Sequence, residues 1–205
     1  MGQFSLFDTE EFVQDEVFLF FDTETNGLPY DYKAPVSDAD NWPHMIQLAW
    51  IQHDAQQNEL SRGDYLVYPD NFYVHESIHN ITHEMATKNG RPIREVLDIF
   101  AKVLASTTVL VAHNISFDEK IIGAEFHRNQ MPDPLPDLNR ICTMMSSIDF
   151  CAIKSGNRFK YPKLAELHHK LFGKGFSGAH NAMVDVEALA RCYWGLKEQN
   201  VVSLY

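Results

Sequence analysis

The sequence has few cysteines and no long apolar run. No window of about 18 consecutive apolar residues is present, so we expect no membrane-spanning helix and no membrane partner. The only cysteines among the 205 residues are Cys142, Cys151 and Cys192, and none belongs to a CxxC pair. A sparse, odd number of cysteines argues against a disulfide framework. It predicts a reducing compartment, which we take to be the cytoplasm.

Positive charge is also scarce. The chain has 17 Lys and Arg residues against 28 Asp and Glu residues, a formal net charge of −11. Proteins that read a nucleic-acid sequence usually present a basic face, so the balance disfavours that class. It does not disfavour an enzyme whose site is built from carboxylates, because bound divalent cations offset part of the negative charge locally.

The length and composition predict one domain. Hydrophobic residues make up 45% of the chain, which is enough for a full core, and there are no repeats, low-complexity tracts or clear linkers. We therefore expect a single domain over residues 1–205, with its core at about 17–198.

The hydrophobic pattern predicts three strands followed by helix–strand–helix units. Strands are expected at Val17–Phe21, Met45–His53 and Tyr65–Tyr68, with turn signals at 57–58 and 63–64, and this order favours an antiparallel meander. A helix over 93–104 after Pro92 and a strand at 107–112 come next. Further helices are expected from Ile115 (with Ser116 and Glu119 as a capping box), from Pro162 and from about Ala182. The chain is predicted to be an α/β protein with a mixed sheet flanked by helices.

Two acidic residues follow the first predicted strand. Asp22 and Glu24 are two positions apart, so their side chains point to the same face, with anchors roughly 6.5–7 Å apart. Carboxylates so placed can share two divalent cations about 3.5–4 Å apart. The structural alternative is a strand that becomes polar where it reaches the surface.

Three more candidate residues lie at predicted helix starts. Asp118 falls in the first turn of the helix from Ile115, where the helix dipole alone would favour an acid. His180 and Asp185 are five residues apart, about 140° around a helix, so both cannot face one way if both are helical. We expect His180 on a glycine-containing loop, suited to a general base, and Asp185 in the first turn with Asn181 as cap. The alternative is a surface histidine near a dipole-favoured acid.

Together these motifs resemble those of the DEDDh, or DnaQ-like, 3′–5′ exonucleases, the family of the proofreading epsilon subunit of bacterial DNA polymerase III and of RNase T. Residues 21–28, 112–118 and 180–185 are similar to the family's DxE motif, its Asn and Asp motif at a helix start, and its HxAxxD motif. Residues 78–82 resemble its His-x-Ile-Thr segment. The resemblance spans about Val17 to Tyr193.

The resemblance implies an RNase H-like fold, with a mixed five-stranded sheet made of the meander plus parallel strands. It implies that Asp22, Glu24, Asp118 and Asp185 hold two Mg²⁺ or Mn²⁺ ions, and that His180 takes a proton from the attacking water. The reaction would release nucleoside 5′-monophosphates from the 3′ end of single-stranded DNA or RNA. The residues that the resemblance places at the substrate are Thr25, Leu28, His79, Asn114 and Phe117.

Several alternatives stay open. A catalytically silent nucleic-acid-binding or polymerase-associated scaffold with the same fold would hydrolyse nothing, even with Mn²⁺. A HAD phosphatase would need Asp at position 24 and a downstream lysine motif, and neither is evident. The motifs do not separate DNA from RNA substrates, a proofreading subunit from a free-standing repair or RNA-processing enzyme, or a monomer from a homodimer. A transition-metal site at His75, His79 and His83 would require a helix, which Asn80 and Thr82 disfavour.

Overall fold

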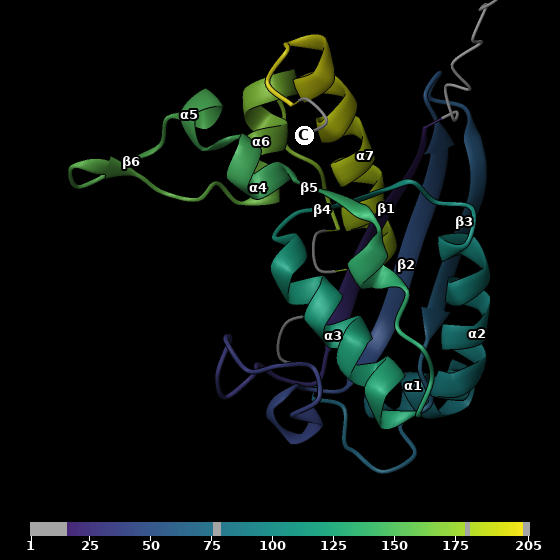
Figure 1. Cartoon of the computed structure of the whole chain (residues 1–205). Helices are drawn as coiled ribbons and strands as arrows, with labels where there is room; N and C mark the ends of the chain where they lie inside the picture. The colour runs from purple at the N-terminus through teal and green to yellow at the C-terminus, as the bar shows by residue number, and fades with distance from the viewer. Residues whose placement is uncertain (1–15, 76–78, 179–180, 203–205) are drawn as a thin grey trace, which may run out of the picture.

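A five-stranded mixed sheet forms the centre of the molecule. The computed structural model describes residues 16–75, 79–178 and 181–202, so His180 lies outside the described residues. The strand order is β3-β2-β1-β4-β5 (Figure 1), with β1 antiparallel to β2, β2 antiparallel to β3, and β4 parallel to both β1 and β5. The strands are β1 Val17–Thr25, β2 Met45–Asp54, β3 Glu59–Leu66, β4 Val109–Ala112 and β5 Asn139–Cys142. The predicted meander joined to parallel strands is confirmed.

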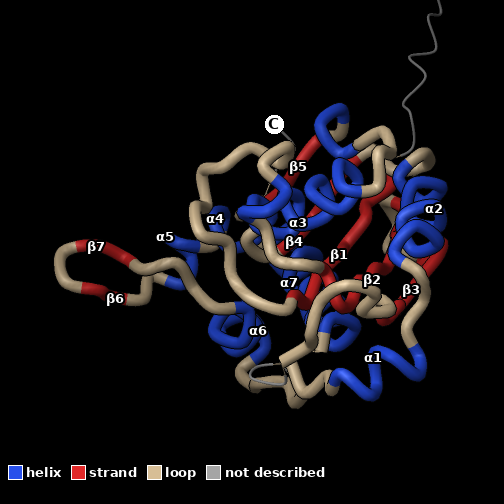
Figure 2. The backbone as a smooth tube through the Cα atoms, turned by 90° about the horizontal axis from the view of Figure 1, so that it is seen from below, coloured by secondary structure: helices blue, strands red, loops and turns tan. Residues whose placement is uncertain are grey.

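Helices cover both faces of the sheet (Figures 1 and 2). One face packs against α2 and α3, and the other against α7 with α6 beside it. The helices are α1 His83–Asn89, α2 Ile93–Leu104, α3 Ile115–Arg128, α4 Thr143–Ser146, α5 Ile148–Cys151, α6 Leu164–Phe172 and α7 Ala182–Glu198, with 3-10 turns at Ala39–Asn41 and Leu135–Asp137. No helix in the described part of the chain is both long and apolar enough to span a bilayer.

Side chains of β1 alternate between the two cores. Leu19 and Phe21 belong to the core under α2 and α3, whereas Phe18 and Phe20 belong to the core under α7. The Phe18 ring lies 5.3 Å from the ring of Tyr193 on α7, centroid to centroid. Because successive strand residues point to opposite faces, this alternation determines the face on which the polar end of β1 presents its side chains.

Strand β3 differs from the prediction. It spans Glu59–Leu66 rather than Tyr65–Tyr68, and the expected turn at 63–64 is wrong, because Gly63 lies within the strand. A Cβ atom at Gly63 would lie 2.2 Å from Cζ2 of Trp50, so glycine serves there to admit the indole ring. The first two residues of β3, Glu59 and Leu60, are exposed, and β3 is an edge strand held by its pairing to β2, which an apolar pattern cannot reveal.

The start of α3 also differs. The expected capping box of Ser116 and Glu119 is wrong: the N-cap residue is Asn114, with a left-handed φ of 75°, and Ser116 lies inside the helix. Glu119 instead pairs with Arg140. Asp118 still falls in the first turn of the helix, as expected.

A small hairpin stands apart from the main sheet. Strands β6 Lys154–Ser155 and β7 Arg158–Phe159 pair only with each other and project away from the body beyond α5 (Figures 1 and 2). The chain returns from the hairpin through Tyr161 and Pro162 into α6.

Candidate active site

The end of β1 carries two of the candidate carboxylates. Asp22 and Glu24 continue the row that begins with Phe18 and Phe20, so both point to the face covered by α7. β1 lies between β2 and β4, and its end is held by β2, where Asp22 pairs with Ala49 and Glu24 with Gln47. The core pattern that buries the phenylalanines is therefore the same pattern that aims the two carboxylates.

The start of α7 brings Asp185 to the same place. Asp185 lies in the first turn, and the Asn181 side chain caps the helix by accepting a hydrogen bond from the Val184 N–H at 3.3 Å. The Gln47 side-chain oxygen accepts a bond from the Ala182 N–H at 3.2 Å. Gln47 is the β2 partner of Glu24 in the strand register. The first turn of α7 is thus tied to the sheet directly beside Glu24.

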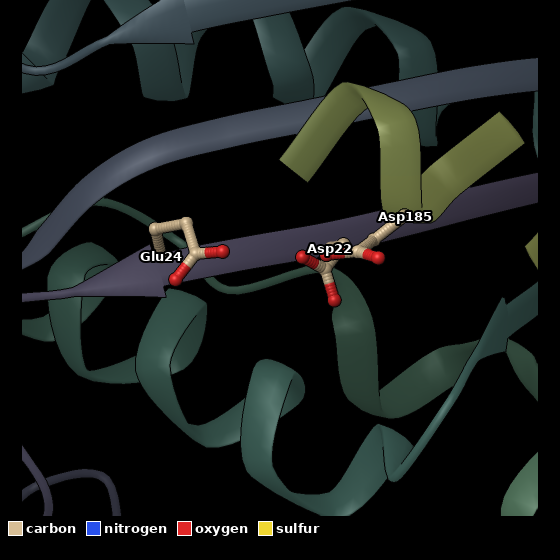
Figure 3. A group of neighbouring side chains, drawn as sticks. All are labelled: Asp22, Glu24 and Asp185. Carbon is tan, nitrogen blue, oxygen red and sulfur yellow. The ribbon is translucent and has the colours of Figure 1, made fainter. Parts of the chain in front are cut away.

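Three carboxylates converge between β1 and α7 (Figure 3). Asp22, Glu24 and Asp185 each place one carboxylate oxygen so that all three atoms lie within 4.8 Å of one another. In the described part of the chain, no other group of three or more His, Cys, Asp or Glu residues meets this condition. A site that offers only oxygen ligands suits hard divalent cations such as Mg²⁺ and Mn²⁺.

Asp118 approaches from the opposite side of β1. It is 3% exposed, and its Oδ1 accepts hydrogen bonds from the N–H of Thr23 at 3.1 Å and from the Thr23 hydroxyl at 2.8 Å. Asp118 is not part of the group of three, but its negative charge acts on both Asp22 and Glu24. The structure therefore brings all four predicted carboxylates into one region.

Burial and mutual repulsion make these acids weak. Burial, followed by the charges of Asp118, Asp185 and Glu24, raises the pKa of Asp22 well above its ordinary value. Burial and the charges of Asp185 and Asp118 raise the pKa of Glu24 to about 7. Burial also raises the pKa of Asp118 to about 7, although the Thr23 hydrogen bonds act in the opposite direction. Such a cluster gains from a cation that would neutralise it, so the residues fit a metal site.

A cleft of about 420 Å³ opens beside the carboxylates. Asp22 and Asp185 form part of its wall, together with His113, Tyr161, Pro162, Lys163 and other residues of α4, α6 and the loop before α7. His113 Nε2 lies 2.9 Å from the Pro162 carbonyl oxygen and Nδ1 lies 3.0 Å from the Thr143 hydroxyl. Since burial lowers the pKa of His113, the neutral ring donates to Pro162 and accepts from Thr143. His113 thereby fastens the segment before α6 to the end of β4.

The five predicted substrate residues are spread around the site. Thr25 ends β1 and its hydroxyl donates to the Gly27 carbonyl at 2.7 Å, while Leu28 is 67% exposed. Asn114 and Phe117 lie at the start of α3 and are half-buried. His79 is buried, and its Nδ1 accepts a bond from the Ile81 N–H at 3.2 Å. Their contacts with a substrate stay predictions.

The three histidines spaced four apart do not share a helix. His75 and His79 precede α1, and His83 is its first residue. Within the described residues, these histidines do not form a group that could hold a metal ion. Thr82 instead caps α1: its side chain accepts a hydrogen bond from the Met85 N–H, so the helix begins at His83, after the other two histidines.

Three positioning residues were not anticipated from the sequence: Thr23, Gln47 and His113. Thr23 is the middle residue of the DxE motif, which specifies only the acidic residues on either side of it. Of the three, only Gln47 could have been noticed in the sequence, because it is a lone polar residue in an otherwise apolar strand segment, Met45–Trp50. His113 adjoins the Asn and Asp motif, but its partners on Thr143 and Pro162 are distant in sequence.

Solved structures of exonuclease I are similar in fold. The E. coli exonuclease I–single-stranded DNA complex in its zinc-bound form aligns with a TM-score of 0.68 at 22% identity, covering 91% of this chain and 41% of that one. The same enzyme with a dA16 oligonucleotide gives 0.68 at 20% identity, covering 91% and 42%. A product-bound exonuclease I gives 0.68 at 21%, covering 92% and 45%. The chain spans less than half the length of these proteins, and at this identity the likeness shows the fold alone.

Comparison with sequences gives the family. No curated protein matches the chain. The family model for exonucleases of the RNase T type matches residues 19–193, from the first core strand to the last helix. That range includes all four carboxylates of the site. The chain belongs to this exonuclease family, which confirms the resemblance to the DEDDh (DnaQ-like) 3′–5′ exonucleases.

Proposed function

We propose that the protein removes nucleotides one at a time from the 3′ end of single-stranded DNA or RNA, in a metal-dependent hydrolysis that releases nucleoside 5′-monophosphates. The observation that carries the proposal is the convergence of Asp22, Glu24 and Asp185, with oxygens within 4.8 Å of one another, and Asp118 beside them. The family assignment supports phosphodiester hydrolysis at a chain end.

The four carboxylates would hold two divalent cations, Mg²⁺ or Mn²⁺. When bound, the cations would activate a water molecule and stabilise the charge on the attacking and leaving oxygens. Asp22 and Glu24 offer oxygens from one strand face, Asp185 from the first turn of α7, and Asp118 from the first turn of α3. Each of these elements is anchored in the core, so the ligand oxygens are held before any substrate arrives.

His180 is proposed as the general base. It stands one position before the cap residue of α7, in the HxAxxD motif that ends with Asp185. A histidine with an ordinary pKa near 6.5 is largely neutral at physiological pH and can take a proton from water. Its chain position close to Asp185 supports this role.

The 3′ end of the nucleic-acid strand is proposed to bind in the cleft beside the carboxylates. Thr25 and Leu28 follow Glu24 along the chain, and the exposed Leu28 would offer an apolar surface to a terminal base. Asn114 and Phe117 stand at the start of α3, the helix that carries Asp118. Exonuclease I has been seen with single-stranded DNA, so a DNA oligonucleotide is the first substrate to test.

The test is hydrolysis of 5′-labelled single-stranded DNA and RNA with Mg²⁺, with Mn²⁺ and with a chelator. We expect a ladder that shortens from the 3′ end only when a divalent cation is present, with nucleoside 5′-monophosphate as the product. Asp185→Ala should lower turnover by orders of magnitude while the fold is retained. Near-normal turnover of that variant would refute the metal assignment.

His180→Ala separates the base from the ligands. Its rate should fall roughly 10²–10⁴-fold, the loss expected for a general base, while metal affinity stays close to that of the wild type. A collapse of metal affinity would instead make His180 a ligand. If the wild type hydrolyses neither polymer with either cation, the catalytically silent scaffold becomes the better account.

A further inference from the structure

The hairpin between α5 and α6 is the basic part of an acidic protein. Residues 152–163, here called the basic hairpin, contain Lys154, Arg158, Lys160 and Lys163 and no acidic residue, whereas the whole chain carries a net charge of −11. Only one of these four side chains, Lys160, forms an ion pair with a described residue, Glu166 at 2.6 Å. Elsewhere, Arg62, Arg91, Arg128 and Arg140 pair with glutamates, whereas Arg94 and Arg191 form no ion pair with a described residue. The hairpin therefore presents cations that the fold itself does not neutralise.

Aromatic rings alternate with these cations. Phe159 is 44% exposed and lies between Arg158 and Lys160, and Tyr161, which follows Lys160, is 58% exposed. Residues 154–159 are exposed throughout, so this part of the hairpin buries no apolar face that would need large rings for packing. Exposed rings among cations are what a single-stranded nucleic acid binds, because bases stack on the rings and phosphates contact the cations.

The hairpin is also attached to the candidate active site. Its last residues, Tyr161, Pro162 and Lys163, line the same cleft as Asp22 and Asp185. The bond from His113 to the Pro162 carbonyl fixes this end of the hairpin to β4. Arg158 lies three residues before Tyr161, roughly 10 Å along an extended chain. The backbone of the hairpin projects away from the body of the molecule (Figures 1 and 2), so its basic and aromatic residues extend from the cleft outward.

We propose that the basic hairpin binds the single-stranded nucleic acid that leads away from the carboxylate site, with Lys154 and Arg158 contacting phosphates and Phe159 stacking on a base. This proposal rests on the proposed function, because the nucleic acid that we assign to the hairpin is the one whose 3′ end is hydrolysed. It gives the hairpin a role on substrates of several nucleotides and none on a dinucleotide, which is too short to reach from the cleft to the hairpin tip.

The test compares two double variants that each remove two exposed cations. Lys154→Ala with Arg158→Ala changes the hairpin, and Lys88→Ala with Lys102→Ala changes α1 and α2 as the matched control. Binding of a fluorescent 20-nucleotide DNA or RNA is measured with Mg²⁺ in an Asp185→Asn background, at several salt concentrations. We expect affinity about tenfold lower for the hairpin variant than for the control. The slope of log affinity against log salt should fall by about 1.4, at roughly 0.7 per lost phosphate contact.

A second readout isolates the active site. With Asp185 intact, the hairpin variant should hydrolyse a dinucleotide as fast as the control variant, while its KM for the 20-nucleotide strand rises. The exchange Lys154→Arg with Arg158→Lys keeps both charges and should restore binding, which excludes misfolding as the cause. Equal affinity and equal salt slope in the hairpin and control variants would overturn the proposal. The binding comparison stands even if the wild type hydrolyses nothing, so failure of the proposed function is seen separately.

A separate pair of variants tests whether a base stacks on the Phe159 ring. Phe159→Ala should weaken binding of the 20-nucleotide strand about tenfold without changing the salt slope, because no phosphate contact is lost. Leu60→Ala, which truncates an equally exposed apolar side chain on β3, should leave affinity unchanged. Phe159→Trp should retain wild-type affinity. Identical binding by Phe159→Ala and Leu60→Ala would exclude the ring from the interface.

Discussion

Thr23 donates two hydrogen bonds to the same oxygen of Asp118, one from its backbone N–H at 3.1 Å and one from its hydroxyl at 2.8 Å. Thr23 lies between Asp22 and Glu24 on β1, but it points to the opposite face of the strand. The middle residue of the motif therefore ties the carboxylate of α3 to the strand that carries the other two acids. The segment of residues 22–24 thus fixes the relative positions of three of the four proposed metal ligands, Asp22, Glu24 and Asp118.

Replacing Thr23 should disturb Asp118 without removing any ligand. Thr23→Val keeps the side-chain shape and the backbone bond but deletes the hydroxyl donor. Loss of a hydrogen bond to a charged group costs about 1.5–3 kcal/mol, so we expect turnover roughly 10–100-fold lower in steady-state hydrolysis of a labelled oligonucleotide. Thr23→Ser keeps the hydroxyl and should stay within a few-fold of the wild type. Wild-type turnover in the valine variant would show that this bond does not position the ligand.

Gln47 should matter for turnover as well as for stability. Gln47→Leu leaves the buried Ala182 N–H without its acceptor and frees the start of α7, which carries Asp185. An unsatisfied buried donor costs about 1–3 kcal/mol in unfolding free energy, measurable by urea denaturation. We expect turnover per folded molecule to fall as well, because Asp185 loses its fixed position.

Gln52 supplies the control for that experiment. It is buried on the same strand, where it pairs with Leu19 rather than with Glu24, and it bonds Ser106 and Thr107. Gln52→Leu should lose a similar amount of unfolding free energy while the folded enzyme keeps its turnover. Equal effects of the two variants on turnover would mean that Gln47 contributes to stability alone.

Stabilisation by divalent cations should depend on pH. The pKa of Glu24 is raised from an ordinary 4.5 to about 7 in the folded protein, so the folded state binds this proton more tightly than the unfolded state. That contribution to stability is fully present below about pH 4.5 and is lost as the pH rises through about 7. Asp118, also raised to about 7, acts in the same direction. A cation competes with these protons and relieves the repulsion that remains when they have left.

The gain in melting temperature with Mn²⁺ should therefore be small at pH 5, increase up to about pH 7–8 and then level off. Differential scanning calorimetry with and without Mn²⁺ over this range measures it. Glu24→Gln should flatten the dependence, because it removes one of the competing protons. A gain that is the same at pH 5 and pH 8 would argue that the cation binds elsewhere.

Gly63 should resist substitution for a reason of packing alone. In Gly63→Ala, the new Cβ would meet the Trp50 ring at 2.2 Å, and overpacking of this kind costs about 1–3 kcal/mol. Each kcal/mol lowers the melting temperature of a chain of this size by about 2–4 °C. Gly175→Ala, where nothing lies within 4 Å, should leave the melting temperature unchanged. Equal melting temperatures of the two variants would show that the ring moves aside at little cost.

The elements predicted from the sequence are those with strong periodic patterns, such as β1, β2, α2 and α7. The missed ones lack a pattern of their own. β5 has four residues, two of them exposed and polar, and is held by parallel pairing with β4. Helix α1 buries only Ala86. Their structure depends on tertiary contacts, which do not appear in a local window.

The residues of the site also divide into those that the sequence predicts and those that it does not. The strand pattern alone places Asp22 and Glu24 on one face, whereas Asp118 and Asp185 required the family resemblance. Thr23 and Gln47 could not be assigned, because their partners lie 95 and 135 residues away in the sequence. Pairings at such distances become visible only when the helices are in place on the sheet.

Asp22→Asn is the sharpest test of whether the carboxylate cluster is a metal site that performs hydrolysis. This substitution keeps the shape of the side chain but removes one charge from a buried, mutually repelling group. In the absence of metal, we expect the variant at pH 8 to melt higher than the wild type. We also expect the variant to lose most of the Mn²⁺-dependent gain in melting temperature and to hydrolyse no oligonucleotide. Hydrolysis at the wild-type rate, or an undiminished Mn²⁺ effect, would contradict it.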